Sequence, residues 1–195
     1  MDEMKTPAAG GQAPAQPEEN TSKFAAALYD MADVVISAMI IIMVIFVFFF
    51  RFAGVDGTSM VPTLSDGDWL IVSSATYDDP QYKDIVIITQ PNAYHAPIVK
   101  RVIAVGGQTV DIDPEAGVVY VDGIALDEPY VNEPTYTLDD IEFPLTVPEG
   151  MLFVMGDNRN DSADSRSSKV GLIDERYVLG KVAGRALPLG RWKVE

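Results

Sequence analysis

The stretch APIVKRVIAVGG, residues 96–107, determines the fold class that the sequence predicts. It is rich in β-branched Val and Ile, and the two glycines at its end are typical of a turn. Because successive side chains of a β-strand point to opposite faces of the sheet, the stretch predicts two rows of side chains. One row is Ile98, Lys100, Val102 and Ala104, and the other is Val99, Arg101, Ile103 and Val105. Lys100 is therefore expected to lie in an apolar row.

Six further segments have a similar composition to this stretch. Each is a short run rich in β-branched and apolar residues, and Pro, Gly and Asp separate one run from the next. The segments are residues 68–74, 84–90, 108–112, 117–123, 152–157 and 178–187. No long helical pattern and no internal repeat interrupts them. We therefore expect residues 54–195 to form one mostly β domain.

An uncharged run of 17 residues, Val34–Phe50, precedes that domain. Its length is near the minimum that crosses a hydrocarbon core of about 30 Å. A cleavable signal peptide would have a shorter apolar core and small residues after it, whereas the bulky FFFRFAGV follows here. We expect a helix over residues 24–53, with residues 31–53 as a retained transmembrane segment. Residues 1–30, in which TPAAGGQAPAQPEEN lacks periodicity, are expected to form a disordered tail.

The composition excludes several classes of function. The chain has no cysteine, so it has no disulfide, thiolate metal site or cysteine nucleophile. Its only histidine, His95, excludes a histidine-rich metal site, and we expect no cofactor. A net charge of −15 argues against nucleic-acid binding, which relies on a basic surface. The few basic residues near the apolar run do not indicate which end faces the cytoplasm.

Ser59 lies in GTSMVPTL, residues 57–64, a few residues after the apolar run. Gly57 and Pro62 are typical of a turn, and the pattern is not the G-x-S-x-G elbow of hydrolases because residue 61 is valine. A serine nucleophile also needs a base. His95 lies in a polar, proline-flanked loop and is expected to be solvated. A lysine serves as a base only where burial lowers its pKa, and Lys100 is the lysine in an apolar row. The residues alone favour a different interpretation of Lys100, as a strand residue at a sheet edge that extends its ammonium to water.

A third polar segment, GDNRNDSADSR, spans residues 156–166 and is expected to form a loop after a buried strand. It lacks the ligand spacing of an EF-hand, and arginines interrupt its acids, so calcium binding is not expected. Its charged residues are expected to form ion pairs that stiffen the loop. They are Asp157, Arg159, Asp164 and Arg166. Ser162 and Ser165 by themselves are cap or turn residues.

These segments, in this order after one membrane anchor, resemble the bacterial type I signal peptidases of the Gram-positive type. GTSMVPTL is similar to the nucleophile box of that family, VKRVIAVGG to its lysine box and GDNRNDSADSR to its C-terminal box. GDWLIV, residues 67–72, is similar to the strand between the first two. The resemblance covers most of residues 54–185. It implies an antiparallel β catalytic domain with one N-terminal transmembrane helix.

The resemblance also implies roles for individual residues. Ser59 would be the nucleophile, Lys100 the general base and Ser162 the residue whose hydroxyl orients the lysine amine. Four residues would support the site: Asp157, Asp164, Arg166 and Arg101. Four others would line small substrate pockets: Met60, Leu64, Val55 and Val99. Gly57 stands where some members carry a serine that helps to bind the oxyanion, so a backbone group would have to replace that donor.

As a member of such a family, the chain would be a serine endopeptidase that cleaves exported preproteins after small residues in an Ala-x-Ala pattern. It would lie in the plasma membrane with a cytoplasmic N-terminus and an extracytoplasmic catalytic domain. Its partners would be signal peptides, the lipid bilayer and an export translocase.

Two alternatives remain at this point. The first is a self-cleaving repressor-type serine–lysine protease, against which the membrane anchor and the lack of a DNA-binding segment count. The second is a membrane-anchored β domain without catalytic activity, against which the joint presence of Ser59, Lys100 and Ser162 counts.

Overall fold

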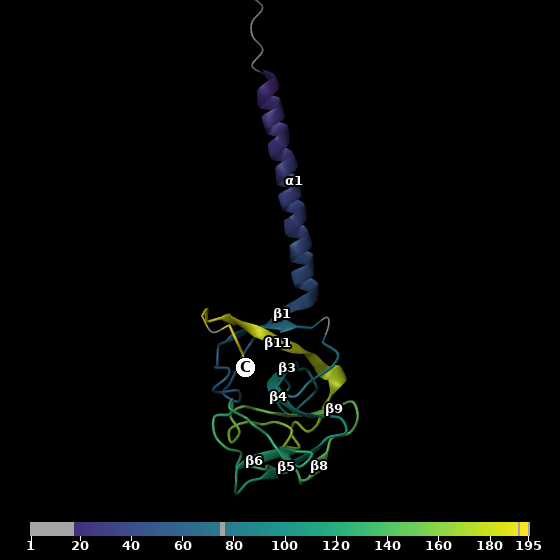
Figure 1. Ribbon diagram of the computed structural model, residues 1–195, viewed down its shortest axis with the longest axis vertical. Helices are drawn as coiled ribbons and strands as arrows, with labels where there is room; N and C mark the ends of the chain where they lie inside the picture. The colour runs from purple at the N-terminus through teal and green to yellow at the C-terminus, as the bar shows by residue number, and fades with distance from the viewer. Residues whose placement is uncertain (1–17, 75–76, 191, 195) are drawn as a thin grey trace, which may run out of the picture. The chain divides into compact units, whose positions relative to one another are not determined.

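The computed structural model describes residues 18–74, 77–190 and 192–194. The chain divides near Ile45 into a helical unit and a β-rich unit, and each is described by itself. The helical unit consists of most of helix α1 (Glu18–Phe49). The β-rich unit carries all the strands (Figure 1).

Helix α1 contains a segment long and apolar enough to cross a membrane, Lys23–Phe49, with a mean hydropathy of 2.8. The predicted helix boundaries were wrong at both ends. The helix begins at Glu18, so residues 18–30 of the expected tail are helical, while residues 1–17 lie outside the described residues. At the other end, Phe50–Gly54 forms strand β1 instead of a last helical turn. The reason is that its backbone pairs with strand β2 (Trp69–Ser73) over five residues.

The β-rich unit has two sheets in which every pair of neighbouring strands is antiparallel. The larger sheet has the order β1-β2-β11-β3-β4-β9-β10, and the smaller has the order β7-β6-β5-β8. The mostly antiparallel β fold predicted from the sequence is thereby confirmed. The remaining strands are β3 (Ile85–Ile88), β4 (Ile98–Val105), β5 (Thr109–Asp113), β6 (Val118–Val121), β7 (Ile124–Ala125), β8 (Leu145–Thr146), β9 (Met151–Met155), β10 (Ile173–Asp174) and β11 (Val178–Leu187).

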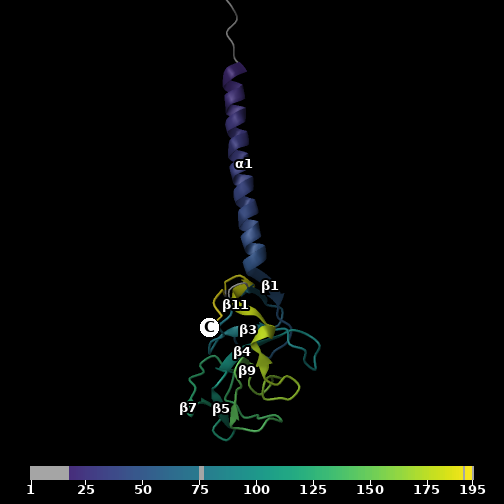
Figure 2. The same ribbon diagram turned by 90° about the vertical axis from the view of Figure 1, so that its right-hand side faces the viewer.

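All seven predicted strands are present, and four short or irregular ones, β1, β7, β8 and β10, were not predicted. A single turn of 3-10 helix, η1 (Glu175–Tyr177), links β10 to β11. Both views of the domain place the smaller sheet at the end away from β1 and β11 (Figures 1 and 2).

Three apolar clusters fill the interior of the β-rich unit. The Met60 cluster joins Met60 and Leu64 to strands β2, β3 and β11, and the Val86 cluster joins β3, β4 and β9. The intersheet cluster joins β4 and β9 of the larger sheet to β5 and β6 of the smaller one. Each buried Val, Ile or Leu contributes about 1.5–3 kcal/mol relative to an exposed one, so these clusters fix the strands that carry the polar segments.

Strand β4 takes part in more than one cluster because it contains a β-bulge. Val102 lies opposite Val154 and Ala104 lies opposite Phe153, which leaves Ile103 as an extra residue. A bulge of this kind reverses the faces to which the following side chains point. The predicted row therefore holds only as far as Val102. Ala104 does not share the face of Lys100 but packs with Ile103 in the intersheet cluster.

Candidate active site

Ser59 and Lys100 come together although 41 residues separate them. Lys100 Nζ donates a hydrogen bond to Ser59 Oγ at 2.6 Å. Ser59 lies in a turn after β1, closed by the hydrogen bond from Val61 N to Thr58 O, and the bond from Leu64 N to Met60 O closes the next turn. The side chains of Met60 and Leu64 are 1% and 0% exposed, so the Met60 cluster anchors the turn that presents Ser59.

Lys100 is buried in the middle of the larger sheet. Its side chain is 3% exposed, and it lies opposite Val86 of β3, between Ile98 and Val102 on its own strand. Burial in this apolar row lowers the pKa of Lys100 to about 8, because the ammonium loses its hydration. The charges of Asp164 and Asp157 raise the pKa and that of Arg166 lowers it, but desolvation is the largest effect. A substantial fraction of this lysine is therefore neutral in mildly alkaline solution.

The polar loop 156–166 holds the Ser59 turn in place. Asn158 N donates to Ser59 O at 3.0 Å, and its side-chain Nδ2 donates to Thr58 O at 3.2 Å. Gly156 packs so closely that a Cβ there would overlap with Ser59 O and with Ser162 Oγ. The loop and the turn are therefore in direct contact, and only glycine fits at residue 156 without displacing one of them.

Three buried ion pairs stiffen this loop, as the sequence predicted in general terms. Arg101 contacts Asp157 through two hydrogen bonds of 2.8 and 2.7 Å, and Arg166 contacts Asp164 through two of 2.8 Å. Asp164 also accepts from Gly156 N at 3.0 Å. Such pairs add little net stability when intact, but removal of one partner costs about 3–5 kcal/mol because a buried charge is left unpaired.

The third pair joins Arg159 to Glu128, a residue that the sequence did not single out. Arg159 contacts Glu128 at 2.5 and 2.7 Å rather than an acid of its own loop. The hydroxyl of Tyr130 donates a hydrogen bond to Glu128. The ring of Tyr130 packs against the guanidinium of Arg101, whose Cζ lies 3.9 Å from the ring centroid. Thr63 donates from its hydroxyl to Asp157. Nothing in the sequence near Glu128 or Tyr130 indicates these contacts, because they join segments about 30 residues apart.

Ser162 lies next to the site, but its predicted contact is not observed. Its Oγ is buried beside Gly156 and makes no hydrogen bond to any residue that the structure describes, Lys100 included. Its orienting role stays a prediction. Gly57 has the positive φ of 101° that favours glycine, and its N–H donates to Asp66 Oδ1 at 2.9 Å. In this conformation the Gly57 N–H is engaged and does not serve as a second donor to an oxyanion.

A groove of about 790 Å³ opens beside Ser59 and Lys100. Its apolar wall comes from β1, β3, β4 and β11, through Ala53, Ile87, Ile98, Val99 and Leu179. Of the four residues predicted to bind substrate, Val99 lines this groove. The other three, Val55, Met60 and Leu64, are buried in the Met60 cluster behind the turn.

No group of three or more His, Cys, Asp or Glu side chains in the described part of the chain is arranged to hold a metal ion.

The comparison with known families agrees with this geometry. The family described as "Signal peptidase, peptidase S26" matches residues 28–187, more than three quarters of the chain. The chain belongs to this family. It is accordingly a serine endopeptidase of the kind that removes signal peptides, and its apolar N-terminal helix fits association with a membrane.

Two relatives that match in sequence support the assignment. A probable signal peptidase I-1 from Synechocystis is 38% identical over 148 residues, which cover 71% of each chain. A signal peptidase I from Bacillus licheniformis is 36% identical, and the match covers 84% of this chain and 90% of the relative. A solved signal peptidase I from Enterococcus faecalis is 35% identical, with a TM-score of 0.44 over 54% of this chain and 97% of that one.

The tight packing at Gly156 leads to a testable prediction. Gly156→Ala forces Ser59 or Ser162 to shift, and a misplacement of about 1 Å at reacting atoms can lower a rate about 100-fold. We expect kcat/KM for cleavage of a preprotein to fall by about that factor, measured alongside the midpoint of thermal unfolding. Gly123→Ala is the matched control, because the space around Gly123 is open and the residue lies away from the site. Its φ of 76° is unfavourable for alanine, so this variant should lose about 1–2 kcal/mol of folding stability. Equal loss of activity in the two variants would mean that general destabilisation is the cause.

Proposed function

We propose that this chain removes signal peptides from exported preproteins with Ser59 as nucleophile and Lys100 as general base. The observation that carries the proposal is the 2.6 Å contact between Ser59 Oγ and a lysine that is 3% exposed. Ser59 and a lysine that loses its proton near neutral pH together provide a nucleophile and a base within hydrogen-bonding distance.

The reaction begins with neutral Lys100. Its amine then accepts the hydroxyl proton of Ser59 as Oγ attacks the carbonyl carbon of the scissile peptide bond. The C–N bond breaks, the Lys100 ammonium returns the proton to the departing amine, and the signal peptide remains as an ester on Ser59. Lys100 next removes a proton from water as the water oxygen attacks the ester. The bond between the carbonyl carbon and Ser59 Oγ then breaks, and the Lys100 ammonium returns the proton to Oγ, which releases the signal peptide as a carboxylic acid. This is the serine–lysine variant of the serine-protease arrangement.

The tetrahedral intermediate carries a negative charge that backbone N–H groups have to bind. The N–H of Ser59 is the natural donor at the nucleophile. The Gly57 N–H joins it only if Asp66 releases it, since that carboxylate accepts its hydrogen bond in the present conformation. The positive φ of Gly57 supports a backbone that can turn in this way when substrate binds.

The groove supports a preference for small residues before the cleaved bond. Its wall is apolar and formed by strands, so an extended peptide with small side chains can lie against Val99, Ile87 and Leu179. We propose that Val99 limits the size of the side chain next to the cleaved bond. Met60 and Leu64 then act from behind, by fixing the turn that carries Ser59.

We further propose that α1 anchors the chain in the plasma membrane once, with its N-terminus in the cytoplasm and the β-rich unit outside. Large apolar side chains are also exposed on strands β1 and β2 and near the end of β11, and they supply a surface for lipid. They are Phe52, Trp69, Leu187, Leu189 and Trp192. Trp69 and Leu187 are direct neighbours in the sheet. An export translocase would deliver the substrates at this surface.

The catalytic assignment predicts the behaviour of two variants. In detergent, the full chain should cleave a preprotein with an Ala-x-Ala site, and Ser59→Ala and Lys100→Ala should each abolish cleavage. The expected loss is on the order of 10⁶ in kcat, as for a nucleophile and base that act as a unit. Ser168→Ala and Lys169→Ala, both exposed, are controls with the same chemical change and should remain active. Wild-type cleavage no better than that of the two site variants would refute the enzymatic proposal.

The lowered pKa of Lys100 predicts the pH dependence of kcat/KM. Below the pKa the lysine is protonated and cannot accept the serine proton, so activity should rise with pH and level off above about 8. At one pH unit below the midpoint about a tenth of the enzyme is active. A midpoint near 10.4, the value of an exposed lysine, would contradict a desolvated base.

The lack of cysteine makes the orientation directly measurable. A single cysteine introduced as Ile124→Cys, at a side chain that is 71% exposed, should react with a membrane-impermeant maleimide on intact bacterial cells. Gln12→Cys should react only after the cells are lysed. The reverse pattern of labelling would overturn the proposed orientation while leaving the catalytic proposal intact.

A further inference from the structure

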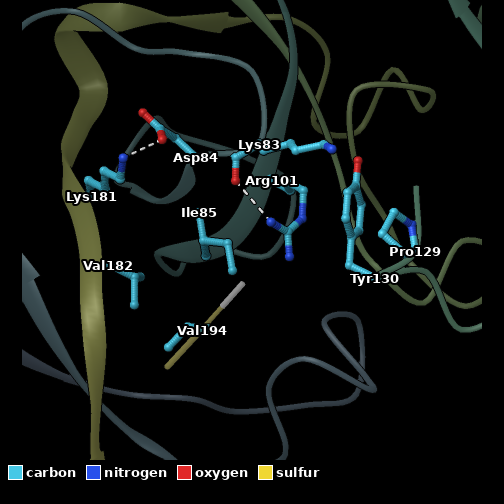
Figure 3. A pocket seen from close by; sticks show the side chains of 9 residues that line it. All are labelled: Lys83, Asp84, Ile85, Arg101, Pro129, Tyr130, Lys181, Val182 and Val194. Carbon is cyan, nitrogen blue, oxygen red and sulfur yellow. Dashed lines mark hydrogen bonds and ion pairs between the residues drawn. The ribbon is translucent and has the colours of Figure 1, made fainter. Parts of the chain in front are cut away.

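A second cavity, of about 480 Å³, shares no lining residue with the Ser59 groove. Figure 3 shows the side chains that line it. Its lining contains three cations, Lys83, Arg101 and Lys181, and a single carboxylate, Asp84. This excess of positive charge is unusual in a chain with 29 acidic and 14 basic residues. We refer to it as the cationic cavity.

The one carboxylate of the cationic cavity is already engaged. Asp84 forms an ion pair with Lys181 and accepts hydrogen bonds from the Tyr77 hydroxyl at 2.8 Å and from Gln81 N at 3.2 Å. Lys83 has no such partner, because no carboxylate of the described residues forms an ion pair with it. Its ammonium lies instead 5.3 and 6.0 Å from the ring centroids of Tyr82 and Tyr130. The cavity therefore retains an uncompensated cation at its rim.

The backbone of Lys83 is held in a conformation that a lysine rarely adopts, with a φ of 75°. Two hydrogen bonds fix it: Lys83 N donates to Val102 O at 3.0 Å, and Arg101 Nη1 donates to Lys83 O at 2.9 Å. Figure 3 shows the ammonium extending from this point toward Tyr130. The cation is therefore presented from a fixed backbone position rather than from a mobile loop.

Arg101 adds a second, buried positive charge to the wall. It is 2% exposed, and its guanidinium packs on the ring of Tyr130. Asp157 and Lys83 O engage its guanidinium, which lines the cavity beside Lys83. The opposite wall is apolar and is formed by Ile85, Val182 and Val194. A ligand that fits both walls carries a compact negative charge and an apolar part.

We propose that the cationic cavity binds the phosphate group of an anionic membrane lipid, with the ammonium group of Lys83 at the phosphate and the glycerol or first methylenes against Val182 and Val194. The choice of a lipid rests on the proposed membrane function and on continuity along the chain. Val194 follows two residues after Trp192, which is 57% exposed, and Leu189 nearby is 86% exposed. These apolar side chains lead from the cavity toward the proposed lipid surface.

The test measures binding rather than catalysis, so it is independent of turnover. The full-length Ser59→Ala variant in neutral detergent is titrated by calorimetry with dihexanoyl phosphatidylglycerol below its micellar concentration. Dihexanoyl phosphatidylcholine and inorganic phosphate are titrated in parallel at equal ionic strength. We expect saturable binding of phosphatidylglycerol and much weaker binding of the other two probes. Equal binding of inorganic phosphate would overturn the lipid as the ligand and assign the cavity to free phosphate.

Variants then locate the site. Lys83→Gln, at an exposed side chain without an ion pair in the described structure, should weaken phosphatidylglycerol binding about fivefold, the effect of one cation near an anionic headgroup. Lys181→Gln should act in the same direction. Arg176→Gln is the matched control, because it removes a cation that is 84% exposed and pairs with Asp174 elsewhere, and it should bind normally. No binding, or equal binding by all three variants, would refute the proposal even if the enzyme cleaves preproteins.

Discussion

The bidentate ion pair between Arg101 and Asp157 connects strand β4 to the loop 156–166, and the rest of the site depends on this connection. Arg101 directly follows Lys100 on β4, and Asp157 begins the loop that contacts the Ser59 turn through Asn158. Both side chains are almost completely buried. Because neither charge can be solvated alone, strand and loop have to keep their relative position for the pair to remain intact. The distance between the base and the nucleophile is thereby fixed by residues that take no part in the proposed chemistry.

The same arrangement explains how a lysine can be neutral in a strongly acidic protein. The nearby carboxylates Asp157 and Asp164 would hold Lys100 protonated, but each is paired with its own arginine. What remains is the apolar row around Lys100, and desolvation outweighs the residual attraction. The arginines therefore contribute to the base indirectly, by neutralising acids that would otherwise oppose it.

The strands and the surroundings of Lys100 could be predicted from the sequence, because they depend on residues that are close together in the chain. The strands and the apolar row around Lys100 follow from side-chain alternation, which needs no knowledge of the partner strand. The end of α1 was missed because apolar side chains continue past the helix at Phe50, Phe52 and Ala53, and only pairing with β2 makes Phe50–Gly54 a strand. The face of Ala104 was missed because a bulge depends on the opposing strand β9. Tyr130 and Glu128 were missed for the same reason, since their partners are distant in the chain. Met60 and Leu64 were recognised as part of the site, but the structure buries them behind the turn.

The bulge at Ile103 divides β4 into two segments with separate side-chain phases. The first segment carries Lys100 and packs with β3, while the second contributes Ile103 and Ala104 to the contact with the smaller sheet. A change of length beyond the bulge can be taken up there by a shift in register, without rotating Lys100 away from Ser59. A longer or shorter turn in the smaller sheet is therefore expected to leave the contact between Lys100 and Ser59 unchanged.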